Sequence, residues 1–306
     1  MKTSTKYSFL YMALGLLTLG GCKKLDGTKD GSGGTTKTGN VSPYTNPNTA
    51  AATCDYDFNE TDLTNSGWTK VFDDEFTGDL SNWGAQDGGL IKEEQCYLPA
   101  NAQIVNGALQ ITAKKETVTG PTSIGSQSTS TFDYTSGWLV SKQSFAANSN
   151  TPKVRIVARI KVASGYGLTS YFFTYGNGAW PTAGEIDNVE VQGDNTKVFA
   201  TDYSYGPSAN VNTVSGGIEY NPTTEDLSSC YHVYTMEWTQ NALTTYLDGK
   251  LVETKTKGGQ IANLFGKPQQ LSLSLPIGGE FYNNLNVANI KVGTMYVDYV
   301  KVFTSN

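Results

Sequence analysis

Histidine is almost absent from this chain of 306 residues, which contains only His232. A zinc centre built on several histidines is therefore excluded. Basic residues are also scarce, 22 against 28 acidic ones, and the net charge of −6 argues against nucleic acid as a partner. Long hydrophobic runs are missing as well. The apolar stretch between Phe9 and Leu19 is too short to span the ~30 Å core of a bilayer as a helix.

That apolar stretch fits an N-terminal export signal, because Lys2 and Lys6 precede it and Leu19-Gly20-Gly21-Cys22 ends it. The small residues before the cysteine resemble a bacterial lipobox, which implies cleavage before Cys22 and lipidation of its thiol. Residues 1–21 are then a lipoprotein signal peptide. The lipid would anchor the chain in the bacterial outer membrane, on its periplasmic or its cell-surface face. The alternative is an ordinary signal peptide with an incidental cysteine.

Residues 22–52 have the composition of a flexible linker. The run from Asp26 to Asn40 contains no apolar side chain, so it cannot bury enough surface to offset the entropy of ordering. Residues 53–306 remain, enough for one large domain, for which a monomer is the default expectation.

Cysteine is rare in that domain, which contains Cys54, Cys96 and Cys230. An export signal implies an oxidising compartment, so one disulfide and one free thiol are expected. Their spacing matches no metal site and does not decide which two of them pair.

The domain shows no internal repeat and no long amphipathic helix. Segments such as 108–113, 154–160, 233–238 and 295–302 have the polarity and composition of short strands. Asn106-Gly107 and Asp248-Gly249 have the composition of two-residue hairpin turns. Many strands and almost no helix predict an all-β fold, a sandwich of two sheets.

Three acids lie within six residues of one predicted strand, Glu185-Ile186-Asp187-Asn188-Val189-Glu190. Acidic residues are depleted in strands, so this cluster needs a reason. Because side chains alternate between faces, Glu185 and Asp187 share a face and Glu190 has the wrong parity. A β-bulge at Asn188-Val189 would return Glu190 to the face of Glu185.

With the bulge, the two glutamate carboxyl groups could approach to roughly 5–6 Å, close to the separation found in retaining glycosidases. One glutamate would attack the anomeric carbon and the other would protonate the leaving oxygen, with Asp187 between them. The alternatives are a solvated acidic edge strand and metal binding by three acids. Since carboxylates already supply the acid and base, His232 is predicted to be structural.

The acid strand and its flanks resemble glycoside hydrolase family 16, the laminarinase and lichenase family. Trp180-Pro181-Thr182-Ala183-Gly184 followed by the acids is similar to the family's bulged motif. Other segments are similar in the same order along the chain, namely 71–78, 93–97, 106–109, 134–137, 158–161, 231–238, 247–250 and 295–303. Each segment is weakly specific, but their colinearity covers nearly the whole domain.

The resemblance implies an antiparallel jelly-roll sandwich of concanavalin A type with a cleft across its concave sheet. Glu185 would be the nucleophile, Glu190 the acid/base and Asp187 their assistant, and Trp180 would stack on a sugar ring. No cofactor is required for catalysis. The family often holds a structural calcium on its convex side, and Glu75, the Gly107 carbonyl and Asp298 match its usual ligand positions.

The chain departs from the family pattern at positions that face the substrate. Lys92 replaces a usual asparagine, Trp138 replaces a usual arginine, and Thr201-Asp202-Tyr203 stands where histidines are usual. Tyr203 and the segment Phe172-Phe173-Thr174-Tyr175 are more similar to lichenases. Trp138, Tyr171, Tyr203 and Lys92 are therefore predicted to bind substrate beside Trp180.

The predicted activity is endo-hydrolysis of β-1,3- or mixed-linkage β-1,3/1,4-glucan by double displacement. The polysaccharide would be the substrate and the membrane would be contacted through the lipid. The alternatives are an agarase- or carrageenase-type galactan hydrolase and a non-catalytic glycan-binding lipoprotein.

Overall fold

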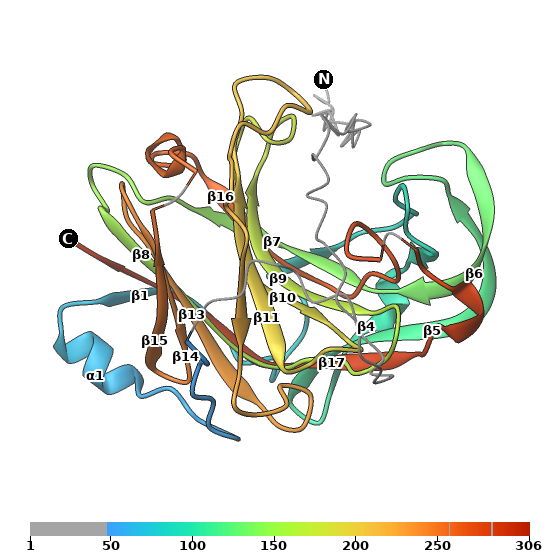
Figure 1. The fold of residues 1–306 in the computed structure, drawn as a ribbon, viewed down its shortest axis with the longest axis horizontal. Coiled ribbons are helices and arrows are strands. Elements are labelled where there is room, and N and C mark those ends of the chain that lie inside the picture. The colour runs from blue at the N-terminus through green and yellow to red at the C-terminus, as the bar shows by residue number, and fades with distance from the viewer. Residues whose placement is uncertain (1–47, 257, 283) are drawn as a thin grey trace, which may run out of the picture.

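The computed structural model describes residues 48–306 apart from 257 and 283. The predicted signal peptide of residues 1–21, the predicted lipidation site Cys22 and most of the predicted linker lie outside the described residues. Within them the chain forms two packed β-sheets, one short α-helix and three 3-10 helices (Figure 1). None of the helices in this part of the chain is long and apolar enough to cross a membrane.

The larger sheet has ten strands in the described part of the chain. From one edge their order is β15 (Lys250–Lys255), β14 (Leu243–Leu247), β13 (His232–Trp238), β8 (Lys153–Lys161), β17 (Gly293–Ser305), β5 (Ala108–Pro121), β6 (Thr129–Ser136) and β3 (Gln95–Tyr97). In addition, β1 (Thr69–Asp74) pairs with β17 and β4 (Ala102–Val105) pairs with β5. Its pairs are antiparallel except for β3 with β6.

The smaller sheet has seven strands in the same part of the chain, all paired antiparallel. Their order is β12 (Glu219–Pro222), β11 (Val198–Ser204), β10 (Glu185–Gln192), β9 (Thr169–Gly176), β16 (Gln269–Ser274), β7 (Trp138–Phe145) and β2 (Trp83–Ala85). The helices are α1 (Glu60–Asn65), η1 (Pro99–Asn101), η2 (Ile261–Asn263) and η3 (Val287–Asn289). The predicted all-β sandwich is thus confirmed.

The main core lies between the two sheets, because alternate strand residues point to opposite faces. Leu109 and Ile111 of β5 and Ile186 and Val191 of β10 belong to it and are almost fully buried. Burying one such side chain contributes roughly 1.5–3 kcal/mol relative to leaving it exposed. This alternation leaves every second residue of the smaller sheet free to face outward.

Two predicted hairpin turns are confirmed. Asn106 and Gly107 have φ of 53° and 78° between β4 and β5, and Asp248 and Gly249 have φ of 50° and 73° between β14 and β15. Positive φ at both central residues is the type I′ signature that favours Asn-Gly and Asp-Gly.

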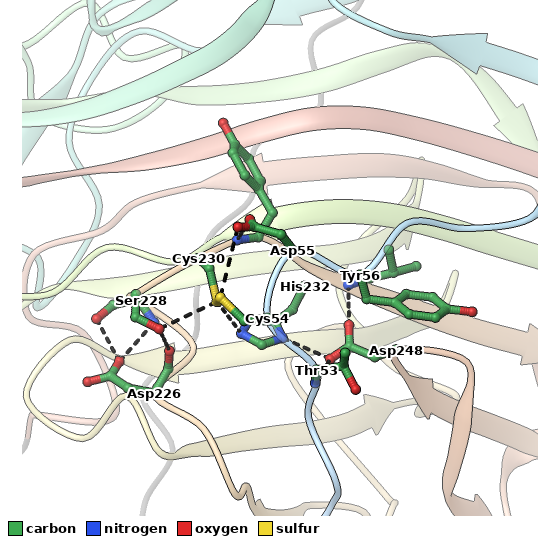
Figure 2. The surroundings of a disulfide bond; sticks show 12 residues. Thr53, Cys54, Asp55, Tyr56, Asp226, Ser228, Cys230, His232 and Asp248 are labelled. Carbon is green, nitrogen blue, oxygen red and sulfur yellow. Dashed lines mark hydrogen bonds and ion pairs between the residues drawn. A yellow bond between two sulfur atoms is a disulfide. The ribbon is translucent and has the colours of Figure 1, made fainter.

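The segment before α1 is attached to both sheets. Ala50 forms a parallel bridge with Thr223, directly after β12. Cys54 forms a disulfide with Cys230, two residues before β13 (Figure 2). Cys96 is a buried free thiol. The structure therefore settles the pairing that the sequence left open.

The only histidine supports this attachment. His232 is fully buried, and its Nδ1 lies 2.8 Å from Oδ2 of Asp248 (Figure 2). The same carboxylate accepts hydrogen bonds from the backbone N–H groups of Thr53 and Val233. His232 is thus a structural residue, as predicted.

Candidate active site

The outer face of the smaller sheet holds a cleft of about 480 Å³. Its lining includes side chains from several strands and from the loops between them. The carboxylates that line it are Glu93, Glu185, Asp187, Glu190, Asp202 and Glu280. The three acids of the predicted catalytic strand therefore share one cleft.

The register of β10 confirms the predicted bulge. Against β9, Asp187 pairs with Phe173 and Val189 pairs with Phe172, so Asn188 is the additional residue. Glu190 then pairs with Tyr171 and faces the same cleft as Glu185. The bulge, not simple alternation, brings the third acid to this face.

An aromatic column runs beside the acids. On β9, Tyr175, Phe173 and Tyr171 lie directly opposite Glu185, Asp187 and Glu190. The rings pack on one another, with centroids of Phe173 and Tyr175 5.7 Å apart. Aromatic faces next to acids suit a carbohydrate, which offers apolar C–H faces and hydroxyl groups.

The loop before β10 aims Trp180 at the first acid. The indole N–H of Trp180 donates a hydrogen bond to the Glu185 carboxylate. Gly184 joins the loop to the strand with φ of 83°, and a Cβ there would lie 2.5 Å from Leu264. Only glycine fits this junction without a shift of neighbouring atoms.

The three acids differ in how readily they ionise. Burial raises the pKa of Glu185 to about 7, with the Trp180 hydrogen bond opposing the rise and the charge of Asp202 adding to it. Burial, together with the neighbouring carboxylates, raises the pKa values of Asp187 and Glu190 well above their usual range. Glu185 is therefore the first of the three to ionise, while Glu190 keeps its proton. An ionised and a protonated carboxyl in one cleft can act as nucleophile and general acid.

Three of the five predicted substrate residues line the cleft: Trp138, Tyr171 and Trp180. The indole N–H of Trp138 donates to Oγ of Ser272 over 2.6 Å, which fixes the ring. Lys92 lies at the rim, where its Nζ is 2.7 Å from Oε1 of Glu280 and both side chains are 57% exposed.

The prediction for Tyr203 is wrong. This side chain is fully buried in the core between the sheets, and its hydroxyl accepts a hydrogen bond from the backbone N–H of Gln260. Its neighbours Asp202 and Ser204 face the cleft instead. Strand parity could have revealed this, because only one of two successive residues can face outward.

Sequence reasoning also gave no role to Glu93, which the structure places in the cleft. Burial raises the pKa of Glu93 to about 7, partly offset by hydrogen bonds from Gln95 and Tyr97. The Gln95 amide donates to its Oε2 over 2.6 Å. Glu93 lies in a loop before β3, so no periodicity pointed to it.

The two carboxylates among the predicted calcium ligands form ion pairs with basic side chains of the same chain. Lys301 Nζ lies 2.6 Å from Oε1 of Glu75, and Arg159 Nη1 lies 2.7 Å from Oδ2 of Asp298. Calcium takes six to eight oxygen ligands. These two ion pairs would compete with a calcium ion for the carboxylates of Glu75 and Asp298, and the calcium site formed with the Gly107 carbonyl stays a prediction.

Comparisons with known proteins agree with this geometry. The model of the family described as Glycosyl hydrolases family 16 matches residues 93–301. Clotting factor G alpha subunit of Tachypleus tridentatus is 29% identical over 250 residues, which cover 77% of this chain and 34% of that protein. Glucan endo-1,3-beta-glucosidase A1 of Niallia circulans is 25% identical over 273 residues, which cover 79% of this chain and 39% of that protein. This chain thus spans less than half the length of both relatives.

A solved structure shows the same fold. The endo-beta-1,3-glucanase from Pyrococcus furiosus superimposes with a TM-score of 0.66 at 28% identity. The match covers 78% of this chain and 95% of that one. The likeness confirms the predicted jelly-roll sandwich.

Proposed function

The chain belongs to glycosyl hydrolase family 16, and from this membership we propose that it is a retaining endo-β-glucanase acting on β-1,3- or mixed-linkage β-1,3/1,4-glucan. One observation carries the proposal: the bulge of β10 presents Glu185, Asp187 and Glu190 to one cleft. A protein that only binds glycans has no need for three acids gathered on one strand, of which Asp187 is buried and the two glutamates are half-buried, because withdrawing carboxylates from water is unfavourable.

The reaction would be a double displacement. Ionised Glu185 attacks the anomeric carbon while Glu190 gives its proton to the departing glycosidic oxygen, which leaves a glycosyl ester on Glu185. Glu190, now ionised, takes a proton from water, and the resulting hydroxide attacks the anomeric carbon and frees Glu185. Asp187, between the glutamates, keeps its proton and can donate it in a hydrogen bond to either carboxylate.

Charge favours an uncharged glycan as the substrate. Six carboxyl groups line the cleft, and none of the described residues that line it is Lys, Arg or His. A sulfated galactan would bring more negative charge into this acidic cleft, which is unfavourable. The aromatic column suits the apolar faces of glucose units, and the endo-1,3-glucanase names of the relatives in Pyrococcus furiosus and Niallia circulans agree with a β-glucan.

A substrate panel with an inactive variant tests the proposal. The wild type should release oligosaccharides from laminarin or lichenan, and not from agarose or carrageenan. Proton NMR at early times should show the β-anomer of the new reducing end, the sign of retention. Glu185→Gln should abolish hydrolysis while binding persists. Wild-type rates for Glu185→Gln would refute the catalytic assignment, and turnover of a galactan alone would refute the substrate.

The export signal motivates a location for this activity. We propose that lipidated Cys22 anchors the enzyme in the bacterial outer membrane, with the linker separating the domain from the bilayer. Metabolic labelling with a palmitate analogue should mark the wild type and not Cys22→Ala, and the variant should be found in the soluble fraction. Equal labelling of both proteins would contradict the anchor.

A further inference from the structure

A fourth carboxylate stands beside the catalytic strand. On β11, Asp202 pairs directly with Asp187 of β10, and the neighbouring pairs are Glu185 with Ser204 and Glu190 with Ala200. Both aspartates line the cleft. We propose that Asp202 is a positioning residue of the reaction: its ionised carboxylate, facing Asp187 across the strand pair, keeps the proton on Glu190 for the acid step. This role rests on the proposed function.

The carboxylate of Asp202 is held in one orientation. The backbone N–H of Tyr203 donates to its Oδ1 over 2.8 Å. The backbone of Gly217 covers the same oxygen, since a Cβ at that glycine would lie 2.5 Å from it. A side chain restrained from two sides cannot turn away from the acids when they change charge.

Among the described residues, the cation that acts on Asp202 is Lys255, and no ion pair joins the two side chains in this part of the chain. Lys255 is buried, and its Nζ donates to the Gly217 carbonyl over 2.6 Å and lies 3.4 Å from Oε2 of Glu253. Its charge lowers the pKa of Asp202, but burial has the larger effect and raises that pKa to about 6. Asp202 is therefore ionised at neutral pH, whereas burial and the neighbouring carboxylates, Asp202 among them, raise the pKa values of Asp187 and Glu190 well above their usual range.

The groups that face Asp202 come from every strand packed near it. They are Glu185, Asp187 and Glu190 of β10, Tyr171 of β9, Tyr220 of β12, and Glu253 and Lys255 of β15. Glu219 of β12 pairs with Thr201 and therefore lies on the other face of the sheet. After burial, the charge of Asp202 is the largest factor that raises the pKa of Glu190, ahead of Glu185. It raises the pKa of Glu185 as well.

The strand register gives the distance from Asp202 to Glu190, and that distance determines how far the charge of Asp202 shifts the pKa of Glu190. Glu190 and Asp202 are diagonal neighbours across a strand pair, a separation of ~7 Å between Cβ atoms. At an effective dielectric constant of about 20, a unit charge at that distance shifts a pKa by roughly one to two units. Removing the charge should therefore move both limbs of the pH profile of kcat/KM toward lower pH.

The test is the pH profile of Asp202→Asn on whichever neutral glucan the wild type hydrolyses. We expect the apparent pKa values of the acid limb and the alkaline limb to be lower than in the wild type by about one unit. Asp202→Ser keeps an acceptor for the Tyr203 N–H and should show the same shift in its pH profile. It replaces Asp202→Asn in the test if that variant does not fold. Asp133→Asn is the control, because it also removes one carboxylate, but from an exposed position of β6 that does not line the cleft, and its pH profile should stay unchanged.

Two results would overturn the inference. One is a folded Asp202→Asn or Asp202→Ser enzyme whose limbs match the wild type. The other is complete loss of activity at every pH with an unchanged Tm, which would make Asp202 a substrate-contacting group instead. Failure of the proposed function itself would look different, since the wild type would then hydrolyse no neutral glucan.

Discussion

The hydrogen bond from Trp180 to Glu185 makes a quantitative prediction for Trp180→Phe. The substitution keeps an aromatic ring for a sugar but removes the N–H that stabilises the ionised nucleophile. A hydrogen bond to a charged group is worth about 1.5–3 kcal/mol, which corresponds to roughly one to two pKa units. The pKa of Glu185, about 7 in the wild type, should therefore rise by that amount.

The assay is kcat/KM on a soluble β-glucan between pH 4 and 10. The acid limb of Trp180→Phe should move upward by roughly one to two pH units, so its activity at pH 6 should fall by about 10- to 100-fold. The alkaline limb, set by Glu190, should stay in place.

Trp138→Phe provides the control for this experiment. Its indole N–H donates to Ser272 rather than to an acid, so the acid limb should not move. If the two variants have the same acid limb as the wild type, the Trp180 bond does not tune the nucleophile and the reasoning is refuted.

Three further predictions concern stability. Asn188 is 3% exposed, and its side chain has no hydrogen-bond partner in the described part of the chain. Asn188→Leu should therefore raise the free energy of unfolding, measured by urea titration, by about 1–3 kcal/mol, whereas a decrease would point to a buried water on the amide. The pKa of Glu190 is raised in the folded state, so its contribution to stability is complete below the unfolded pKa of ~4.3 and is lost as pH rises and the carboxyl ionises. The free energy of unfolding of Glu190→Gln should therefore fall less than that of the wild type between pH 5 and 8, and equal falls would contradict this. Because Lys301 and Arg159 form ion pairs with Glu75 and Asp298, EDTA should leave Tm unchanged. A fall in Tm that calcium reverses would contradict this and support the calcium site.

At the site, the predictions from sequence were correct where they used the alternation of side chains along a strand. The wrong parity of Glu190 required a bulge at Asn188-Val189, and the register of β10 contains it. The same rule applied to β11 would have chosen Asp202 over Tyr203. Resemblance to a lichenase tyrosine led to the wrong residue there, because a motif match carries no information on which face a side chain occupies.

Other features depend on contacts between distant segments, which local sequence does not contain. Cys54 and Cys230 are 176 residues apart, so their pairing required the fold. The cations beside Glu75 and Asp298 come from β17 and β8, and no spacing in the sequence joins them. Glu93 reaches the cleft from a loop, where neither strand nor helix periodicity applies.

The double attachment of the segment before α1 also defines a path for mechanical force. A pull on residue 48 would first load the hydrogen bonds of Ala50 to Pro222 and Thr224 in shear. Beyond them the tension would pass through the covalent bond from Cys54 to Cys230 and into β13, in the larger sheet. The intervening stretch, which includes β10, is bypassed. A load applied at the N-terminal side would thus reach the larger sheet through the disulfide and not along the strand that carries the three acids.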